Sequence, residues 1–493
     1  MIARAALIGS LSLVLTLTFP HSGAGSQQAE TVLHHAVTTS SAAAQAAFDK
    51  GLLDYYAYNV EAAEHEFYAA ADFDPHLAMA WWGIAQANAS DLNIDPTDDR
   101  DQQGEEAITK AQELEQYASP EERAYIEAAA QRFSSEPKAK HDQLLVHYRD
   151  AMAQVYQSYP NDADAAALYG EAQLYVFASG AENGKGSFTD EERRAYAARM
   201  ATLLPFFQAA LRRYPLHPGV LHFYIHAADE ARQQAVAVGA AKTLASLQFE
   251  PTAAHLTHMP GHIFLKMGMY GETVDTARRS VDMDYANINC CHPGYYSEPR
   301  YYHDHNVTFL MVALTETGQP EAALAAAQKD GSRYLVARQL VVLKRWDQIL
   351  GLESDPKSAT LVFTKGLAYA AKGDRQSLQT AINTIPVASD DDAGWKTMVA
   401  AMKSTLQAQA AMLDHDDASA LRLLTQAGEQ SDRGDAMMVS EYPTLYYYSP
   451  HLALAQLAQH LQQPAVARAA YEAELRCSPK SPAALQGLAL LQP

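Results

Sequence analysis

The chain has 493 residues, with 58 acidic against 37 basic side chains, a formal net charge of −21, 48% hydrophobic residues and three cysteines. This length and apolar content exclude a small disulfide-stapled domain and a disordered chain. The acidic balance, with no basic run, argues against binding to nucleic acid or to an anionic membrane surface, because both require clustered Lys and Arg.

The N-terminus has the pattern of a secretory signal peptide over residues 1–24. Arg4 provides the basic start, residues 5–19 form an apolar run, and the small residues 22–24 supply a cleavage site. About 15 apolar residues are too few to span a bilayer. We therefore expect an exported, periplasmic or secreted protein with no membrane insertion after cleavage, and a flexible segment over residues 25–43. The alternative is a short N-terminal helix.

A repeat of 34 residues organises the rest of the chain. Its first clear copy has small residues where two antiparallel helices touch, an aromatic residue between them and a proline after the pair. These residues are Gly51, Ala63, Phe67, Ala70 and Pro75, at positions 8, 20, 24, 27 and 32 of a tetratricopeptide unit. The same spacing recurs at Phe207, Ala210 and Pro215 and at Ala467, Tyr471 and Pro479. The sequence therefore predicts an all-α, tetratricopeptide-like fold over residues 44–493, a right-handed superhelix of stacked helix pairs with a concave inner wall.

Histidines gather in the middle of this array, where nine of the 19 lie within residues 217–305. The repeat is phased there by Pro215, Pro251 and Gly318, at positions 32, 32 and 15 of their units. This phase places two histidines at each of three positions in the first helices of consecutive units. Position 5 is held by His222 and His258, position 9 by His226 and His262, and position 2 by His255 and His305.

Positions 2, 5 and 9 line the concave surface of this repeat, and residues four apart share one helix face. Imidazoles from two neighbouring helices are therefore expected to converge on one point, with two more beside them. The four are His222, His226, His258 and His262, and the two are His255 and His305. Glu171, at position 9 of the preceding unit, is expected to be a ligand or a general base. The donor set suits a divalent transition metal and does not distinguish Zn, Cu, Fe, Ni and Mn.

Two other interpretations of the histidines remain open. The first is a groove of neutral histidines that binds a ligand without metal. The second is a network between helices that only stiffens the joint between units.

An insertion over residues 284–305, rich in Tyr, Pro and His, separates two units whose normal joint is a few residues. We expect a lid or binding loop beside the groove, and the alternative is a loop that caps exposed core. The residues expected to contact a small molecule or peptide in the groove are His217, Tyr301, Tyr302, His303 and Asn306.

The cysteines leave three states open. Cys290 and Cys291 are adjacent, so a vicinal disulfide between them is one state. A disulfide from one of them to Cys477 is the second, and unpaired thiols are the third. The absence of a CxxC pattern argues against thioredoxin-like redox chemistry.

Several phrases resemble a bacterial and fungal family of tetratricopeptide-repeat proteins with HPGxxHxYIH and HMPxHI motifs. The motifs stand at residues 217–226 and 258–263, and the resemblance covers roughly residues 45–330. It implies the repeat fold and leaves the chemistry open. Beyond His305-Asn306 the chain departs from the pattern, because residues 307–309 read Val-Thr-Phe where similar proteins tend to have His-Phe. The signature histidines that the resemblance implies are His217, His222, His226, His255, His258 and His262.

Two functions fit these observations. The first is an exported superhelix whose groove carries a histidine-rich, metal-binding site for a small-molecule or peptide ligand. The second is a metal-dependent enzyme in which the insertion excludes water and Glu171 serves the metal or the proton transfer.

Overall fold

The computed structural model is built from α-helices, with no strand among the described residues. The structure describes residues 33–89, 92, 97–133, 141–182, 189–290, 299–387, 393–437 and 444–491. The expected signal peptide over residues 1–24 and the tip of the insertion, residues 291–298, lie outside these ranges. Within them, no helix is long and apolar enough to cross a bilayer.

The helices follow one another with short connections. The first nine are α1 (Ala42–Tyr56), α2 (Val60–Phe73), α3 (Ala78–Asn88), α4 (Asp98–Glu113), α5 (Pro120–Ala129), α6 (His141–Ser158), α7 (Ala163–Glu182), α8 (Asp190–Ala201) and α9 (Leu204–Arg213). The middle of the chain forms α10 (Pro218–Glu230), α11 (Gln234–Ser246), a 3-10 turn η4 (Pro251–Ala253), α12 (Ala254–His258), α13 (Pro260–Lys266), α14 (Tyr270–Cys290), α15 (Pro299–Glu316) and α16 (Pro320–Asp330).

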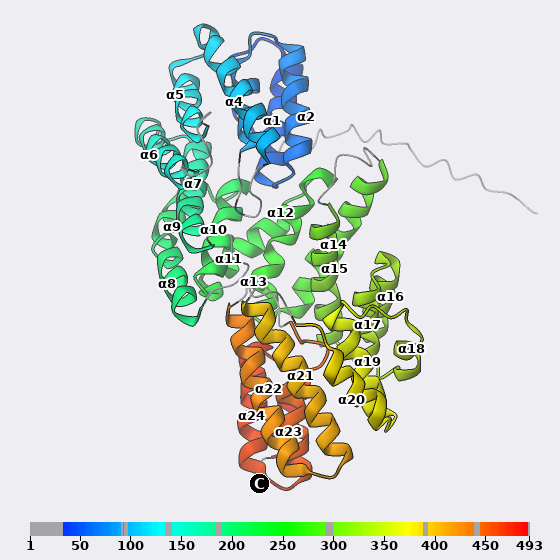
Figure 1. The fold of residues 1–493 in the computed structure, drawn as a ribbon. Helices are drawn as coiled ribbons and strands as arrows, with labels where there is room; N and C mark the ends of the chain where they lie inside the picture. The colour runs from blue at the N-terminus through cyan, green and yellow to red at the C-terminus, as the bar shows by residue number, and fades with distance from the viewer. Residues whose placement is uncertain are drawn as a thin grey trace, which may run out of the picture. The chain divides into compact units, whose positions relative to one another are not determined.

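The last third continues the pattern with nine further helices. They are α17 (Arg333–Val342), α18 (Trp346–Gly351), α19 (Ala359–Ala371), α20 (Arg375–Thr384), α21 (Ala393–Leu413), α22 (Asp417–Met437), α23 (Pro450–His460), α24 (Pro464–Cys477) and α25 (Pro482–Leu490). Neighbours in this order pack against each other as antiparallel pairs, and Figure 1 shows the pairs following one another along the chain. The prediction of an all-α, tetratricopeptide-like repeat fold is confirmed.

One backbone turn joins the two helices of a pair in eight places. In each, a residue in the left-handed region ends the first helix, and the next N–H bonds to the carbonyl five residues earlier, as from Asn59 to Asp54. This is a Schellman motif, which satisfies carbonyls that the helix end leaves without a partner. The left-handed residues are Tyr58, Arg232, Gly268, Gly318, Lys344, Gly373, His415 and Gln462.

Small residues and rings interlock between the helices as the repeat spacing predicts. The ring of Phe67 lies against Gly51 of α1 and Gly83 of α3, where an added Cβ would come within 2.9 Å and 2.4 Å of ring atoms. Phe67 is fully buried. The same match recurs between Gly170 and Phe207, so position 8 needs a glycine because position 24 carries a ring.

The chain also brings together helices that are far apart in sequence. Helix α1 packs against α10, and the Tyr56 hydroxyl donates to Asp164 of α7 over 2.6 Å. Helix α8 packs against α22, and the Tyr270 hydroxyl donates to the carbonyl of Pro479. Contacts in this array are therefore not limited to neighbouring units.

The structure differs from the sequence prediction in two segments. Residues 33–41, predicted to be flexible, are packed, because Leu33 and Val37 are buried. The insertion predicted at 284–305 is mostly helical, since α14 and α15 extend into it from both sides. Hydrogen bonds between these two helices, described below, account for the extension.

Truncating Phe67 tests the interlocking. Phe67→Ala should lower the free energy of unfolding by about 3–5 kcal/mol, because it opens a cavity between two glycines that leave no side chain to fill it. Phe73→Ala in the same helix is the control, since the Phe73 side chain is 56% exposed and should change the stability by only about 0.5 kcal/mol. Urea unfolding measures both, and equal losses would contradict the packing argument.

Candidate metal centre

Three of the predicted histidines form a first group, His222, His226 and His255. They come from α10 and α12, and each offers a nitrogen that lies within 4.8 Å of those of the other two. The Nε2 atoms of His222 and His255 are 3.2 Å apart. Nitrogens bound to one ion at about 2.0–2.1 Å lie about 3.3 Å apart at a tetrahedral angle, so this spacing suits a shared cation.

The orientation of His222 is fixed by the first helix of the array. Its Nδ1 lies 2.8 Å from the backbone carbonyl oxygen of Tyr56, which only accepts, so Nδ1 carries the proton and donates. Nε2 therefore presents a lone pair toward His255. A backbone carbonyl behind an imidazole is a common way for proteins to orient a metal ligand.

The second group, His258, His262 and His305, is drawn from α12, α13 and α15. The Nε2 of His258 is 2.7 Å from that of His262 and 3.0 Å from that of His305. Behind the group, His262 Nδ1 lies 3.3 Å from a carboxylate oxygen of Asp229, which Lys266 also contacts. His262 is therefore oriented by a carboxylate, again with Nε2 toward its neighbours.

Four of these six histidines are buried, and His255 and His305 are partly buried. His222 and His258 are 0% and 1% exposed, and the pKa of each imidazole is held well below its ordinary value by burial and by the charges of neighbouring histidines. Both rings are therefore neutral at pH 7, which is the state that binds a metal. The sequence predicted residues on the wall of an open groove, whereas the described residues place these side chains in the interior.

One aromatic ring backs each group. The Tyr58 ring lies 4.8 Å from that of His222 and 5.4 Å from that of His255, measured between centroids. The Phe309 ring lies 4.8 Å from the rings of both His258 and His305. Each group is thus shielded on one side by an apolar face.

The two groups are neighbours. The ring centroids of His255 and His258 are 6.1 Å apart, and those of His226 and His262 are 6.4 Å apart. The sequence predicted that the pairs in α10 and in α12–α13 meet at one point, and the structure instead joins each pair to a third histidine.

Glu171 belongs to neither group. Its carboxylate is fully buried in α7 and accepts hydrogen bonds from Tyr55 over 2.8 Å and from Tyr175 over 2.6 Å. Arg132 donates to Gln86 beside Tyr55, so a cation lies near this carboxylate. These contacts assign Glu171 to a buried polar network that joins α1 to α7.

His217 also has structural partners. It caps α10, where its Nδ1 accepts from the backbone N–H of Val220, and its Nε2 lies 3.0 Å from Asp164. Asp164 also contacts His35 over 2.8 Å, and these two histidines hold the pKa of the buried carboxyl well below its usual range, although burial acts in the opposite direction.

His303 and Asn306 face another carboxylate. His303 Nδ1 lies 3.3 Å from Asp284 and its Nε2 lies 3.3 Å from Asp330, while the Asn306 amide donates to Asp284 over 2.8 Å. His303 ties α15 to α14 and α16, and Asn306 ties α15 to α14. The side chains of Tyr301 and Tyr302 lie outside the described residues, as do those of Cys290 and Cys291.

The sequence analysis missed two further features. Asp432, His451 and Cys477 come together, with Asp432 2.7 Å from His451 Nε2 and 3.4 Å from a free Cys477 thiol. Burial and Asp432 raise the pKa of this thiol, which favours its protonated form. No motif links these residues in the sequence.

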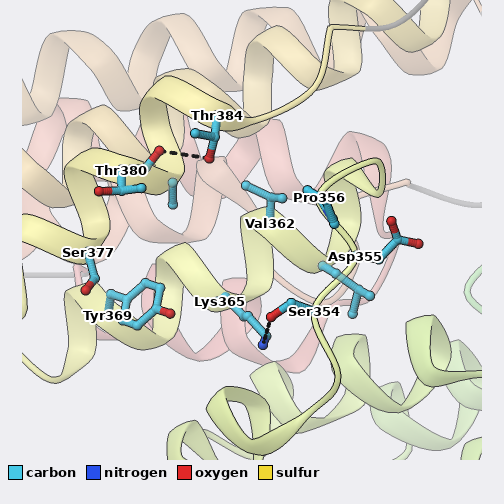
Figure 2. A pocket seen from close by; sticks show the side chains of 11 residues that line it. Ser354, Asp355, Pro356, Val362, Lys365, Tyr369, Ser377, Thr380 and Thr384 are labelled. Atoms are coloured by element: carbon cyan, nitrogen blue, oxygen red, sulfur yellow. Dashed lines mark hydrogen bonds between the residues drawn. The ribbon is translucent and has the colours of Figure 1, made fainter.

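A hollow of about 240 Å³ lies between α19, α20 and the loop before α19. Figure 2 shows Lys365 and Tyr369 on its wall, with the Lys365 ammonium bonded to Ser354 over 2.7 Å. None of the predicted site residues lines it.

Comparisons with known proteins add little. No family model and no curated protein matches the chain. Among solved structures, the tetratricopeptide domain of P58(IPK) aligns at 11% identity and a TM-score of 0.25 over 88% of this chain and 92% of that chain. Yeast Tom70 aligns at 11% identity and a TM-score of 0.32 over 91% of this chain and 94% of that chain. At these values the likeness carries no conclusion, and the fold assignment rests on the helix pairs themselves.

The contact between His35 and Asp164 predicts a pH dependence. Burial disfavours the charged ring, but the hydrogen bond and charge of Asp164 outweigh it and raise the pKa of His35 to about 9. The stabilisation is therefore complete below the unfolded-state value of about 6.5 and disappears as the pH rises through 9.

We expect His35→Gln to lower the free energy of unfolding by up to about 3 kcal/mol at pH 6, from 1.36 kcal/mol per pKa unit, and by less at pH 9.5. Denaturant unfolding at both pH values measures the difference. His34→Gln is the matched control, because that side chain is 57% exposed. Equal losses for His35→Gln at both pH values would contradict the assignment.

Proposed function

We propose that this protein is a tetratricopeptide-like scaffold that binds a transition metal through its buried histidines. One observation carries the proposal, namely six imidazoles, from four helices, whose nitrogens gather in two groups of three. Imidazole without thiolate suits Zn, Cu, Fe and Ni, and Cu²⁺ forms the most stable complexes among these divalent metals.

The main alternative is a network held together by hydrogen bonds alone, and the proton count in the second group disfavours it. His262 uses its Nδ1–H on Asp229, so its neutral ring offers only a lone pair at Nε2. His258 Nε2 then has at most one proton to donate, although the Nε2 atoms of both His262 and His305 lie within hydrogen-bond distance of it. A cation accepts all three lone pairs at once.

In this proposal the protein binds a metal and a ligand without catalysing a reaction. The carboxylate of Glu171 is occupied by two tyrosine hydroxyls, which gives no support to its role as a general base. We therefore favour a metal-holding scaffold that presents a small molecule or peptide over an enzyme. Export to the periplasm or the medium is part of the proposal and rests on residues 1–24 of the sequence.

Elemental analysis of the purified full chain after reconstitution with Cu²⁺ or Zn²⁺ tests the proposal. Wild-type protein should retain near-stoichiometric metal after gel filtration, and the double variant His258→Ala/His262→Ala should lose half of it or more. The control is His460→Ala, which removes an exposed histidine at the end of α23 and should retain all of it. Folded wild-type protein that retains no metal would contradict the proposal.

A further inference from the structure

We infer that the repeat builds two separate metal ions into this protein, one in each three-histidine group, with a small anion bound between them. The inference rests on the proposed function, because it specifies how many ions the histidines hold and what ligand they take. The positions of the six histidines in consecutive units of the repeat are the first observation that supports it.

The two groups follow one positional rule. In the first, positions 5 and 9 of one unit, His222 and His226, meet position 2 of the next unit, His255. In the second, positions 5 and 9 of that next unit meet position 2 of the unit after it, at His258, His262 and His305. The groups are therefore equivalent under the repeat, which is how a solenoid makes two copies of one site.

The rule produces ligands only in these two places. In the unit before, positions 5 and 9 are Ala167 and Glu171, and the following position 2 is Gly219, so imidazole is missing throughout. In the unit of His305, positions 5 and 9 are Thr308 and Val312. The two sites therefore depend on which residues the units carry at these positions.

Each group supplies the number of nitrogens that leaves an ion reactive. Four-coordinate ions with three protein ligands keep a position for an exogenous ligand. The two aromatic rings, Tyr58 and Phe309, each lie against one group. Between the two groups, the ring centroids of His226 and His262 are 6.4 Å apart, and those of His255 and His258 are 6.1 Å apart.

Charge argues for an anion in that space. Each group, as the described residues form it, consists of three imidazoles, which bind a metal in their neutral form. The carboxylate of Asp229 contacts the His262 ring, and Lys266 already pairs with this carboxylate over 2.9 Å. Two dications held by neutral donors in a buried place are favourable only if an anion shares the charge. Hydroxide or another anion of one to three atoms satisfies both ions at once, as in two-metal sites with ions about 3.5–4 Å apart.

A metal titration of the apo full chain separates one ion from two. Equilibrium dialysis against Cu²⁺ should give two equivalents per wild-type chain. His255→Gln and His305→Gln should each give one, because each lowers the affinity of its own group by at least about 100-fold, more than the loss of an outer-shell partner does. These two members were chosen because they are only partly buried, and retention of the other equivalent shows that the variant is folded.

Two spectroscopic measurements complete the test. The integrated EPR signal of the wild type should account for well under two spins per chain, because ions joined by one anion couple, while each variant should give about one full spin. Azide should change the visible absorption of the wild type at one equivalent per pair of ions. His460→Ala should behave as the wild type in all three measurements.

The outcomes distinguish the inference from the proposed function. Two equivalents, one of them lost in each variant, support the inference. A single equivalent that either variant removes would mean one shared ion, which overturns the inference and leaves the proposed function intact. Two uncoupled spins with no response to azide would overturn the bridging anion, and no binding would overturn both.

Discussion

The turn between the helices of each pair is the constraint on which the rest of this structure depends. In eight helix pairs the first helix ends on a residue with a left-handed backbone conformation, and the following N–H donates to the carbonyl oxygen five residues earlier. In these eight pairs the turn fixes the rotation of the second helix relative to the first. Five of these residues are not glycine, and each costs roughly 1–2 kcal/mol in that conformation. The packing of whole helix pairs outweighs that cost.

The fold and the six histidines that come together were predictable from the sequence, and the way in which these histidines group was not. Spacing alone located Phe67 between small residues and assigned six histidines to positions 2, 5 and 9. It did not show that the histidine at position 2 joins the histidines of the preceding unit, because the offset between stacked units depends on tertiary packing. The break of one helix at Pro260, between α12 and α13, also separates His258 from His262 in a way that periodicity does not reveal.

Other errors had a signal in the sequence. His303 and His305 are two residues apart, and such residues do not share a helix face, so only one of them was able to face the histidines. His217 precedes Pro218 at a helix start, which is the place of a capping residue. Glu171 carried no such signal, because its partner Tyr55 lies 116 residues earlier and reaches it only through the contact of α1 with α7 and α10.

The carbonyl of Tyr56 gives the array a kind of cooperativity that solenoids usually lack. In a simple repeat protein each unit is coupled only to its neighbours, so terminal units fray independently. Here the ring of His222 is aimed by an oxygen from a residue 166 positions earlier, at the end of the first helix. Detachment of that helix would leave His222 Nδ1 without this acceptor even if every histidine stayed in place, so the affinity of the proposed metal centre would depend on docking of the N-terminal unit.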